Sequence, residues 1–321
     1  MRTRPLSAFS ARDLEALLAE EAAHWEDELL WDYSEVRSAV AQGIDRRTLL
    51  GRVALAENGP AGYCYFIQDA GRAVVGSLFA AERQRDRGLE EALLDAVVSD
   101  AVLDHRNRRV ECQTLFSTAP KLDACFRRSE FRSLSRHYLV RDLGDEPAEE
   151  PTVDRPERRF WLRPVRKNDL DRAADIIFES HRGSLDAALN LTYATRASCR
   201  TFVDTLALRG GCGAFDSDAS QIAESDQGPI GVLLASRLSA RSGHICQVSV
   251  ASSAQGRGTG GALVRSALQA FERQGLDAAS LSVTVGNASA YRLYTRLGFR
   301  VRKVFAAHAW ARPPARIELP A

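Results

Sequence analysis

The feature that most constrains the fold of this chain is an approximate internal repeat around an acidic, proline-containing segment. Residues 144–158 read GDEPAEEPTVDRPER, with three prolines, many acidic residues and little apolar content. This composition is typical of a linker. The segment divides the 321 residues into halves of similar length, which suits two ordinary domains. If the halves are copies of one unit, both should predict the same order of elements.

Both halves do predict that order. In the second half, apolar periodicity predicts helices over residues 169–179, 196–208, 261–274 and 288–297, and strands over residues 160–165, 229–236, 245–250, 280–285 and 299–307. In the first half, it predicts helices over residues 14–28, 35–42 and 122–129, and strands over residues 49–56, 62–67, 73–80, 109–115 and 137–143. Residues 85–100 are expected to form a glycine loop followed by a helix. We therefore expect two diverged copies of one α+β unit, residues 1–143 and 159–321.

Composition excludes several classes of protein. The net charge of +1 argues against a nucleic-acid binder. No segment resembles a signal peptide or a membrane span, so we expect a cytoplasmic protein that does not bind membranes. The six cysteines form no C-x-x-C pair, so we expect reduced core residues and no metal site or disulfide framework. They are Cys64, Cys112, Cys125, Cys199, Cys212 and Cys246.

A glycine-rich stretch, QGRGTGG at residues 255–261, fits two different phosphate-binding motifs. From Gly256 it reads G-x-G-x-x-G, the dinucleotide fingerprint, and from Gln255 it reads Q-x-x-G-x-G, which acyl-CoA-binding loops use. Both motifs direct backbone N–H groups and a helix N-terminus at a pyrophosphate. The dinucleotide motif requires several further βα units and an acidic residue at the end of the next strand. Here only one such unit follows, and the next strand ends Val285-Gly286-Asn287, without an acid.

The region from His244 to Phe299 resembles the GNAT acetyltransferase superfamily. The resemblance rests on VSVASSAQGRGTGGALV, followed by SVTVGNASAYRLYTRLGF, which contains N-x-x-A-x-x-L-Y-x-x-x-G-F. It covers most of that family's cofactor half. The tandem arrangement is similar to that of two-domain acetyltransferases such as mycothiol synthase. The resemblance implies two GNAT-like domains, each with a mixed, mostly antiparallel sheet flanked by helices.

The resemblance also implies the residues that bind acetyl-CoA. The loop N–H groups should face the pyrophosphate, because glycine has no Cβ to hold the phosphate away. Val248 should direct its N–H at the thioester carbonyl, and Val250 should contact the pantetheine amide. Asn287 should contact the same arm or only cap its helix, and Gln255 should orient the loop. The expected loop contacts are Gly256, Arg257, Gly258, Thr259, Gly260 and Gly261.

Two catalytic residues are expected. By resemblance, Tyr294 protonates the leaving CoA thiolate, with Tyr291 one helical turn earlier as the alternative. Many family members place a glutamate base eleven residues before the loop glutamine, and here that residue is His244. A histidine can accept a proton near neutral pH. The rival bases are Glu179, His181, Asp186 and Glu224.

The first half lacks these residues. When the loops are aligned, Arg85 takes the place of Gln255, and Glu90 takes the place of Gly260. Carboxylates at this position would repel a phosphate. The residues that correspond to His244, Tyr294 and Asn287 are Val74, Phe126 and Ala119. We therefore expect a first domain that keeps its fold but is catalytically silent.

The expected function is acetyl-CoA-dependent N-acetylation of a primary amine in the second domain, without a metal. The sequence leaves the acceptor open among an amino sugar, a small amine, an antibiotic and a peptide N-terminus. It leaves the oligomeric state open too, and a monomer is consistent with two domains that pair within one chain. The alternative is a non-catalytic acyl-CoA sensor or partner-binding protein, since the carboxylate at position 244 is missing.

Overall fold

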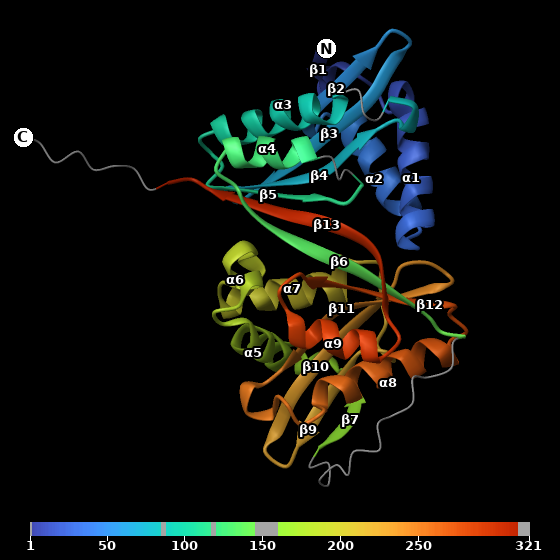
Figure 1. Ribbon diagram of the computed structural model, residues 1–321, viewed down its shortest axis with the longest axis vertical. Coiled ribbons are helices and arrows are strands. Elements are labelled where there is room, and N and C mark those ends of the chain that lie inside the picture. Colours follow the sequence, from blue (N-terminus) through green and yellow to red (C-terminus); the bar gives the residue numbers. More distant parts are fainter. Residues whose placement is uncertain (1, 85–87, 117–119, 145–159, 314–321) are drawn as a thin grey trace, which may run out of the picture. The chain divides into compact units, whose positions relative to one another are not determined.

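The chain folds into two compact units in the computed structural model (Figure 1). The structure describes residues 2–84, 88–116, 120–144 and 160–313, so residues 145–158 of the expected linker lie outside the described part. Unit 1 consists of residues 1–27, 33–135 and 305–321, and unit 2 of residues 28–32 and 136–304. Each unit thus contains a segment from the other half of the sequence.

Unit 1 is a mixed sheet with helices on both faces. Its strand order is β1-β2-β3-β4-β5-β13, in which only β4 and β5 pair in parallel. The strands are β1 (Arg2–Pro5), β2 (Leu50–Ala56), β3 (Gly59–Asp69), β4 (Arg72–Ala80), β5 (Arg109–Thr114) and the last residues of β13 (Arg300–Ala311). The helices are α1 (Glu15–Leu29), α2 (Ser34–Asp45), α3 (Leu89–Leu103) and α4 (Pro120–Arg128).

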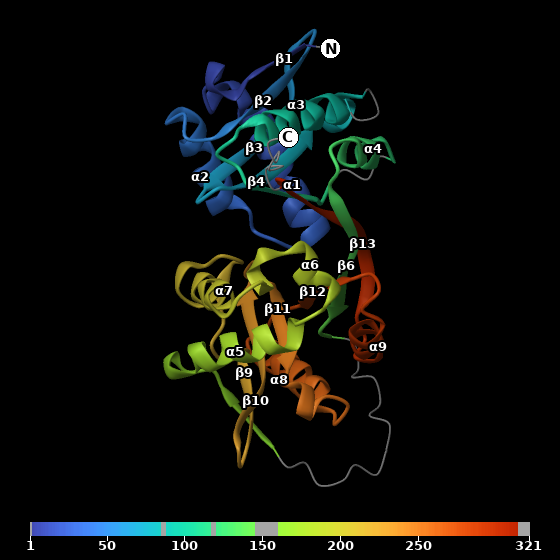
Figure 2. The same ribbon diagram turned by 90° about the vertical axis from the view of Figure 1, so that its left-hand side faces the viewer.

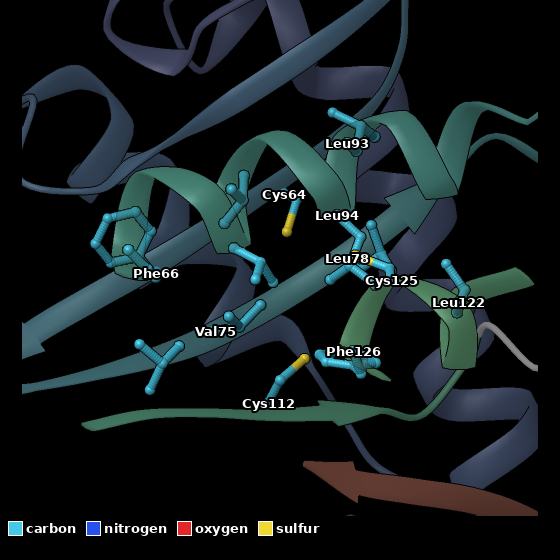
Figure 3. Close-up of a cluster of buried hydrophobic side chains, with 14 of the residues drawn as sticks. Cys64, Phe66, Val75, Leu78, Leu93, Leu94, Cys112, Leu122, Cys125 and Phe126 are labelled. Atoms are coloured by element: carbon cyan, nitrogen blue, oxygen red, sulfur yellow. The ribbon is translucent and has the colours of Figure 1, made fainter. Parts of the chain in front are cut away.

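Alternation along the strands of unit 1 supplies two separate cores, because successive residues of a strand face opposite sides of the sheet. Cys64 and Phe66 belong to the core under α3 and α4, whereas Tyr63 and Tyr65 belong to the core that contains α1 and α2. Figure 3 shows the first core, where apolar side chains of α3 and α4 meet those of β3, β4 and β5. Cys64, Cys112 and Cys125 are buried there as free thiols.

Unit 2 repeats this architecture. Its strand order is β6-β12-β11-β10-β9-β7, with β8 also paired to β10, and only β11 and β12 pair in parallel. The strands are β6 (Arg132–Asp142, from residue 136 on), β7 (Trp161–Pro164), β8 (Ala214–Phe215), β9 (Gln221–Ser225), β10 (Gly228–Arg237), β11 (Ser242–Val250) and β12 (Ala278–Thr284). The helices are α5 (Leu170–His181), α6 (Leu185–Leu189), α7 (Arg196–Arg209), α8 (Thr259–Arg273) and α9 (Ala288–Arg296).

Two cores flank the sheet of unit 2 as well. Val232 and Leu234 of β10 belong to the core of α5 and α7, and Leu233 and Ala235 belong to the core of α8. Figures 1 and 2 show α5 and α7 on one face of this sheet and α8 on the other. The sheet therefore separates a face with the glycine loop from a face with α5 and α7.

The two units exchange their closing strands. Residues 136–142 of β6, from the first half of the sequence, pair with β12 in unit 2. Residues 306–311 of β13, from the second half, pair with β5 in unit 1. The expected linear division assigns residues 136–143 to the first half and 305–321 to the second, whereas each segment belongs to the other unit. The two strands hold equivalent places in equivalent sheets, so their apolar pattern does not reveal which sheet they join.

The α+β architecture and its duplication, expected from the sequence, are confirmed by the structure. The structure also contains elements that the sequence analysis missed, namely the short strands β1, β8 and β9 and the five-residue helix α6. β9 lies within DASQIAESDQG, where polar residues outnumber apolar ones and obscure the strand pattern.

Candidate active site

The parallel strands β11 and β12 separate part-way along their length. They pair only from Ser242–Ala278 to Ile245–Leu281, although β11 continues to Val250. A β-bulge at Cys246 marks the separation, because Leu234 of β10 pairs with Gln247 and Ala235 with Ile245. A bulge turns a strand and often lies beside a functional site. Beyond Ile245, one edge of β11 has no paired strand in the described part of the chain.

The backbone pattern shows which groups face this open edge. Ala251 donates its N–H to the Ile230 carbonyl of β10 at 2.8 Å. In an antiparallel pair, alternate residues direct both backbone groups at the partner strand. Ser249 and Gln247 therefore face β10, whereas Val248 and Val250 direct their N–H groups at the open edge. These are the two residues that the resemblance assigns to the acyl-pantetheine arm.

The glycine loop follows directly and leads into α8. Gly256 and Gly258 have φ values of +74° and +82°, which glycine adopts at little cost, and a Cβ on either would meet no protein atom within 4 Å. Gly258 is the N-cap of α8, no side chain caps the helix, and its first turn contains no acidic residue. The N–H groups of that turn have no intrahelical partner, so they form an anion-binding position.

The remaining expected cofactor residues lie around this helix start. Gln255 donates its Nε2 to the Val250 carbonyl at 3.0 Å, which joins the loop to β11. Thr259 is buried, its hydroxyl bonds to the Ala254 carbonyl, and Arg257 is exposed. Asn287 caps α9 by accepting the N–H of Ala290 at 3.2 Å. Because its hydroxyl is engaged, Thr259 can bind a phosphate only through its backbone N–H.

Arg265 is a neighbour of the loop that the sequence analysis missed. Its guanidinium nitrogens would lie 3.5 and 3.6 Å from a Cβ at Gly261, so the side chain folds back over the first turn. The position is four residues after Gly261, on the same helix face. That spacing is the signal from which Arg265 could have been found.

Tyr294 projects from α9 into the core that contains α8. The side chain is 8% exposed and packs edge-on against Phe299, with ring centroids 6.0 Å apart. Burial raises the pKa of Tyr294 to about 12, so the phenol is protonated at neutral pH. Its hydroxyl makes no hydrogen bond to any described residue and is therefore available to a ligand. Tyr291 lies nearby on the same helix, with its ring 5.2 Å from that of His137.

A group of polar side chains gathers between β11 and β12, from α5 to the start of α7. Tyr193 donates its hydroxyl to Gln247 of β11 at 3.0 Å, and the His181 ring stacks on Tyr193 at 3.9 Å. Asp186 accepts hydrogen bonds from Thr284 of β12 at 2.6 Å and from Arg136 of β6 at 3.0 Å. Burial raises the pKa of Tyr193 to about 12; Arg136 opposes this increase, and Asp186 and Tyr294 add smaller increases.

His181 is held as a neutral imidazole whose Nε2 has no hydrogen-bond partner among the described residues. Its Nδ1 lies 2.9 Å from the Ile177 carbonyl, which only accepts, so Nδ1 carries the proton and Nε2 is the basic atom. Burial lowers the pKa of His181, and Arg136 lowers it further, while the Ile177 bond and Asp186 oppose this. The neutral form therefore predominates at neutral pH.

The other candidate bases differ in their surroundings. His244 is nine-tenths buried, bonds through Nδ1 to Ser280 at 2.9 Å, and burial lowers its pKa to about 4. Glu179 pairs with Arg196, and Glu224 pairs with Arg163 at the far strands of the sheet. Of the five candidates, His181 and Asp186 lie in the polar group between the two separating strands.

Unit 1 provides an internal comparison. Gly88 is the N-cap of α3 with φ +73°, as Gly258 is for α8, but Glu90 and Glu91 occupy the first turn. Phe126 packs edge-on against Phe131 at 5.2 Å, and the N–H of Phe131 bonds to the Phe126 carbonyl. Tyr294 and Phe299 make the same two contacts. Phe126 thus occupies the place of Tyr294 without a hydroxyl. Arg85 and Ala119 lie outside the described residues.

Arg136 shows what a linear division of the sequence misses. It lies in the first half of the sequence, and only the strand exchange brings it to Asp186 in unit 2. Nothing in the local sequence of β6 indicates this contact.

No helix among the described residues is long and apolar enough to cross a lipid bilayer.

Comparisons with known proteins agree with this geometry. Residues 193–299 match the acetyltransferase (GNAT) family. A GCN5-related N-acetyltransferase from Sphaerobacter thermophilus has the same fold, with a TM-score of 0.66 at 20% identity over 97% of this chain and 96% of that one. No protein with a curated description matches the sequence.

Two further solved structures share the fold. A tandem GNAT protein from the clavulanic acid biosynthesis pathway matches with a TM-score of 0.55 at 12% identity, over 98% of this chain and 99% of that one. A glucosamine N-acetyltransferase region of a fungal multi-domain β-N-acetylglucosaminidase matches with a TM-score of 0.59 at 15% identity, over 96% of this chain and 38% of that one. Residues 193–299 thus match the GNAT acetyltransferase family, and the chain over nearly its whole length is similar in fold to solved tandem GNAT proteins.

Proposed function

We propose that unit 2 is an acetyl-CoA-dependent N-acetyltransferase that acetylates a primary amine by direct attack. The match of residues 193–299 to the GNAT family supports acyl-CoA and an acceptor as substrates. The observation that carries the proposal is the position of the glycine loop next to the open edge of β11. The backbone N–H groups that can bind a thioester arm, on β11, are therefore followed within residues 248–261 by those that can bind a pyrophosphate, at the start of α8.

In this mechanism the amine nitrogen attacks the thioester carbonyl carbon. The Val248 N–H stabilises the charge that develops on the carbonyl oxygen, which is commonly a large contribution in acyl transfer. The C–S bond then breaks, and Tyr294 donates its proton to the CoA thiolate. A phenol with a pKa of about 12 keeps its proton until the thiolate is adjacent, which suits an acid that acts late.

The amine must lose a proton, and we propose His181 as the group that accepts it. The Nε2 atom of His181 is unprotonated, and the His181 ring stacks on Tyr193, whose hydroxyl bonds to Gln247 of β11. Asp186 lies near enough to stabilise the imidazolium that forms. His244 stays a predicted base, but its burial makes proton uptake costly and favours His181.

Unit 1 is proposed to be catalytically silent, with acetyl-CoA bound only in unit 2. Glu90 and Glu91 occupy the helix start where phosphates would bind, and Phe126 has no proton to donate. Calorimetric titration with acetyl-CoA should give one site per chain. Two equal sites would contradict this assignment.

The test of activity is CoA release with a panel of amines. The panel should contain an amino sugar, since one similar structure is a glucosamine N-acetyltransferase region, together with a small amine, an aminoglycoside and a peptide N-terminus. Amine-dependent release that Tyr294→Phe slows would support the proposal. Tight acetyl-CoA binding without release for any acceptor class would favour the alternative, a non-catalytic acyl-CoA sensor.

A further inference from the structure

Three side chains that commonly bind metals meet near the bulge of β11, and one of them is His244, the predicted base that the proposed mechanism does not use. They are Cys212, His244 and Cys246, and one ligand atom of each lies within 4.8 Å of the other two. Both cysteines are free thiols and only half-buried, unlike the other four, which are buried. His244 is 9% exposed. The cluster thus combines two partly accessible thiols with one buried imidazole.

The hydrogen bonds of His244 leave one nitrogen for a ligand. Ser280 donates its hydroxyl to the Gly243 carbonyl, so its oxygen accepts the proton of His244 Nδ1 at 2.9 Å. Nδ1 is then protonated, and Nε2 holds the lone pair. No hydrogen bond to Nε2 is found among the described residues. A metal-bound histidine shows this arrangement, in which the second ring nitrogen donates to a neighbouring oxygen.

The loop that presents Cys212 has a tightly restricted backbone. It reads RGGCGAF over residues 209–215. A Cβ at Gly213 would lie 2.3 Å from the Arg237 carbonyl oxygen, and one at Gly211 would lie 2.4 Å from Thr205 Cγ2. Gly213 also has φ +73°. Glycine on both sides therefore lets the loop approach β10 closely and holds the Cys212 thiol beside β11.

The distances suit a zinc ion. Zn–S bonds of about 2.3 Å and Zn–N bonds of about 2.0–2.1 Å in a tetrahedral site separate ligand atoms by roughly 3.6–3.8 Å. The three ligand atoms lie within 4.8 Å of one another, so each pair is at most about 1 Å farther apart than in a tetrahedral zinc site. Half-buried cysteine side chains can make such movements.

Unit 1 shows that the duplicated fold does not create this cluster by itself. Its bulge residue is Gly76, between Val75 and Ser77 of β4, which pair with Phe66 and Tyr65. Gly76 corresponds to Cys246, and Val74 corresponds to His244. The thiols and the imidazole thus belong to the sequence of unit 2 alone.

We propose that unit 2 binds one zinc ion through Cys212 Sγ, Cys246 Sγ and His244 Nε2, with a fourth position for water. Binding converts two thiols to thiolates and releases two protons. The ion joins the 210–213 loop to the bulge where β11 leaves β12. This site revises the expectation that all six cysteines are core residues without a metal, and it does not depend on transferase activity.

Metal binding by the wild-type protein is the first measurement. The full chain, reduced and freed of metal with a chelator, should take up about one zinc per chain. Cobalt added in its place should give the near-ultraviolet absorption of a thiolate–cobalt bond. Zinc titration in weak buffer should release protons, about two per ion. Failure to take up zinc, or cobalt binding without a thiolate band, overturns the proposal.

Variants then identify the ligands. Cys212→Ala and Cys246→Ala should each lower zinc affinity by at least about 100-fold, and Ser280→Ala by about 10–100-fold, since it holds His244 indirectly. Cys199→Ala is the matched control, because among the described residues the Cys199 thiol bonds to the Thr192 carbonyl alone. Circular dichroism should show that all four are folded. Unchanged affinity in Cys212→Ala overturns the proposal, as does a Cys212–Cys246 disulfide in a protein that takes no zinc after reduction.

Discussion

Replacing Gly260 by glutamate should weaken acetyl-CoA binding while leaving the ligand-free protein at least as stable. Gly260 is the second residue of α8. A Cβ there would meet Leu293 Cδ2 at 3.6 Å and Val250 Cγ2 at 3.8 Å, which are ordinary contacts. A Cβ therefore fits at this position without displacing the backbone. Gly260→Gln has the same shape without the charge and is the matched control.

The two effects of the charge have opposite signs. An acidic residue in the first turn favours the helix by about 0.3–1 kcal/mol. Against one unit of phosphate charge at about 6 Å, it costs roughly 0.7 kcal/mol at the dielectric constant of water and about 2.8 kcal/mol at an effective value of about 20. A pyrophosphate carries two such charges. The loss of binding is therefore at least about 1.4 kcal/mol, or about tenfold in Kd.

Isothermal titration with acetyl-CoA and thermal unfolding without ligand measure the two quantities. We expect Gly260→Glu to bind acetyl-CoA at least about tenfold more weakly than Gly260→Gln. Its melting temperature without ligand should be no lower than that of Gly260→Gln. The difference in Kd between the two variants should become smaller at high salt. Equal Kd values for the two variants would refute the reasoning, because the phosphates would then lie away from the first turn of α8.

Three further predictions concern single side chains. Tyr294→Phe should lower kcat with little change in acetyl-CoA affinity or melting temperature, because its hydroxyl bonds to no described residue; an unchanged kcat would transfer the acid role to Tyr291 or water. His181→Ala should lower kcat/KM by about 10²–10⁴-fold. In the wild-type protein, the pH profile of kcat/KM should have an inflection below pH 6.5, because activity is lost as the His181 imidazole protonates beside Asp186, Arg136 and Tyr193. The variant should lack this inflection, and a retained inflection would exclude His181 as the base. Glu21 of α1 is buried and accepts hydrogen bonds from Trp25, Tyr63 and Ser77. Burial raises the pKa of Glu21, so the folded state favours its protonated form, and this stability is present below about pH 4.5 and lost as the pH rises. Glu21→Gln should therefore raise the melting temperature at pH 8 but not at pH 4, which differential scanning calorimetry can measure.

The glycine loop and α8 were predictable because local rules determine them. Two positions require positive φ, so glycine is needed there, and the apolar period of α8 identifies the following helix. The capping role of Asn287 follows from equally local chemistry. Short-range patterns of this kind are visible in one sequence.

The polar group around Asp186 was not predictable, because its members come together only through the tertiary fold. Arg136 lies 50 residues before Asp186, and Thr284 lies 98 residues after it. The Cys212–His244–Cys246 cluster was not predicted for a related reason, because the bulge at Cys246 changes which side chains of β11 lie on the same face of the sheet. A strict two-residue alternation does not anticipate a bulge.

The exchange of closing strands has a consequence for synthesis on the ribosome. The first unit's sheet needs residues 306–311, and the contact between Thr114 and Ala306 spans 192 residues. Unit 2, in contrast, has its borrowed strand from β6 before its own first strand is made.

The usual order, in which the N-terminal domain completes its fold first, is therefore reversed here. While residues 160–304 are being translated, β5 is left as an exposed sheet edge, and such edges pair readily with other chains. Nascent chains that end before β13 should accordingly need a chaperone to stay monomeric, whereas release of the last strand protects the unit that was translated first.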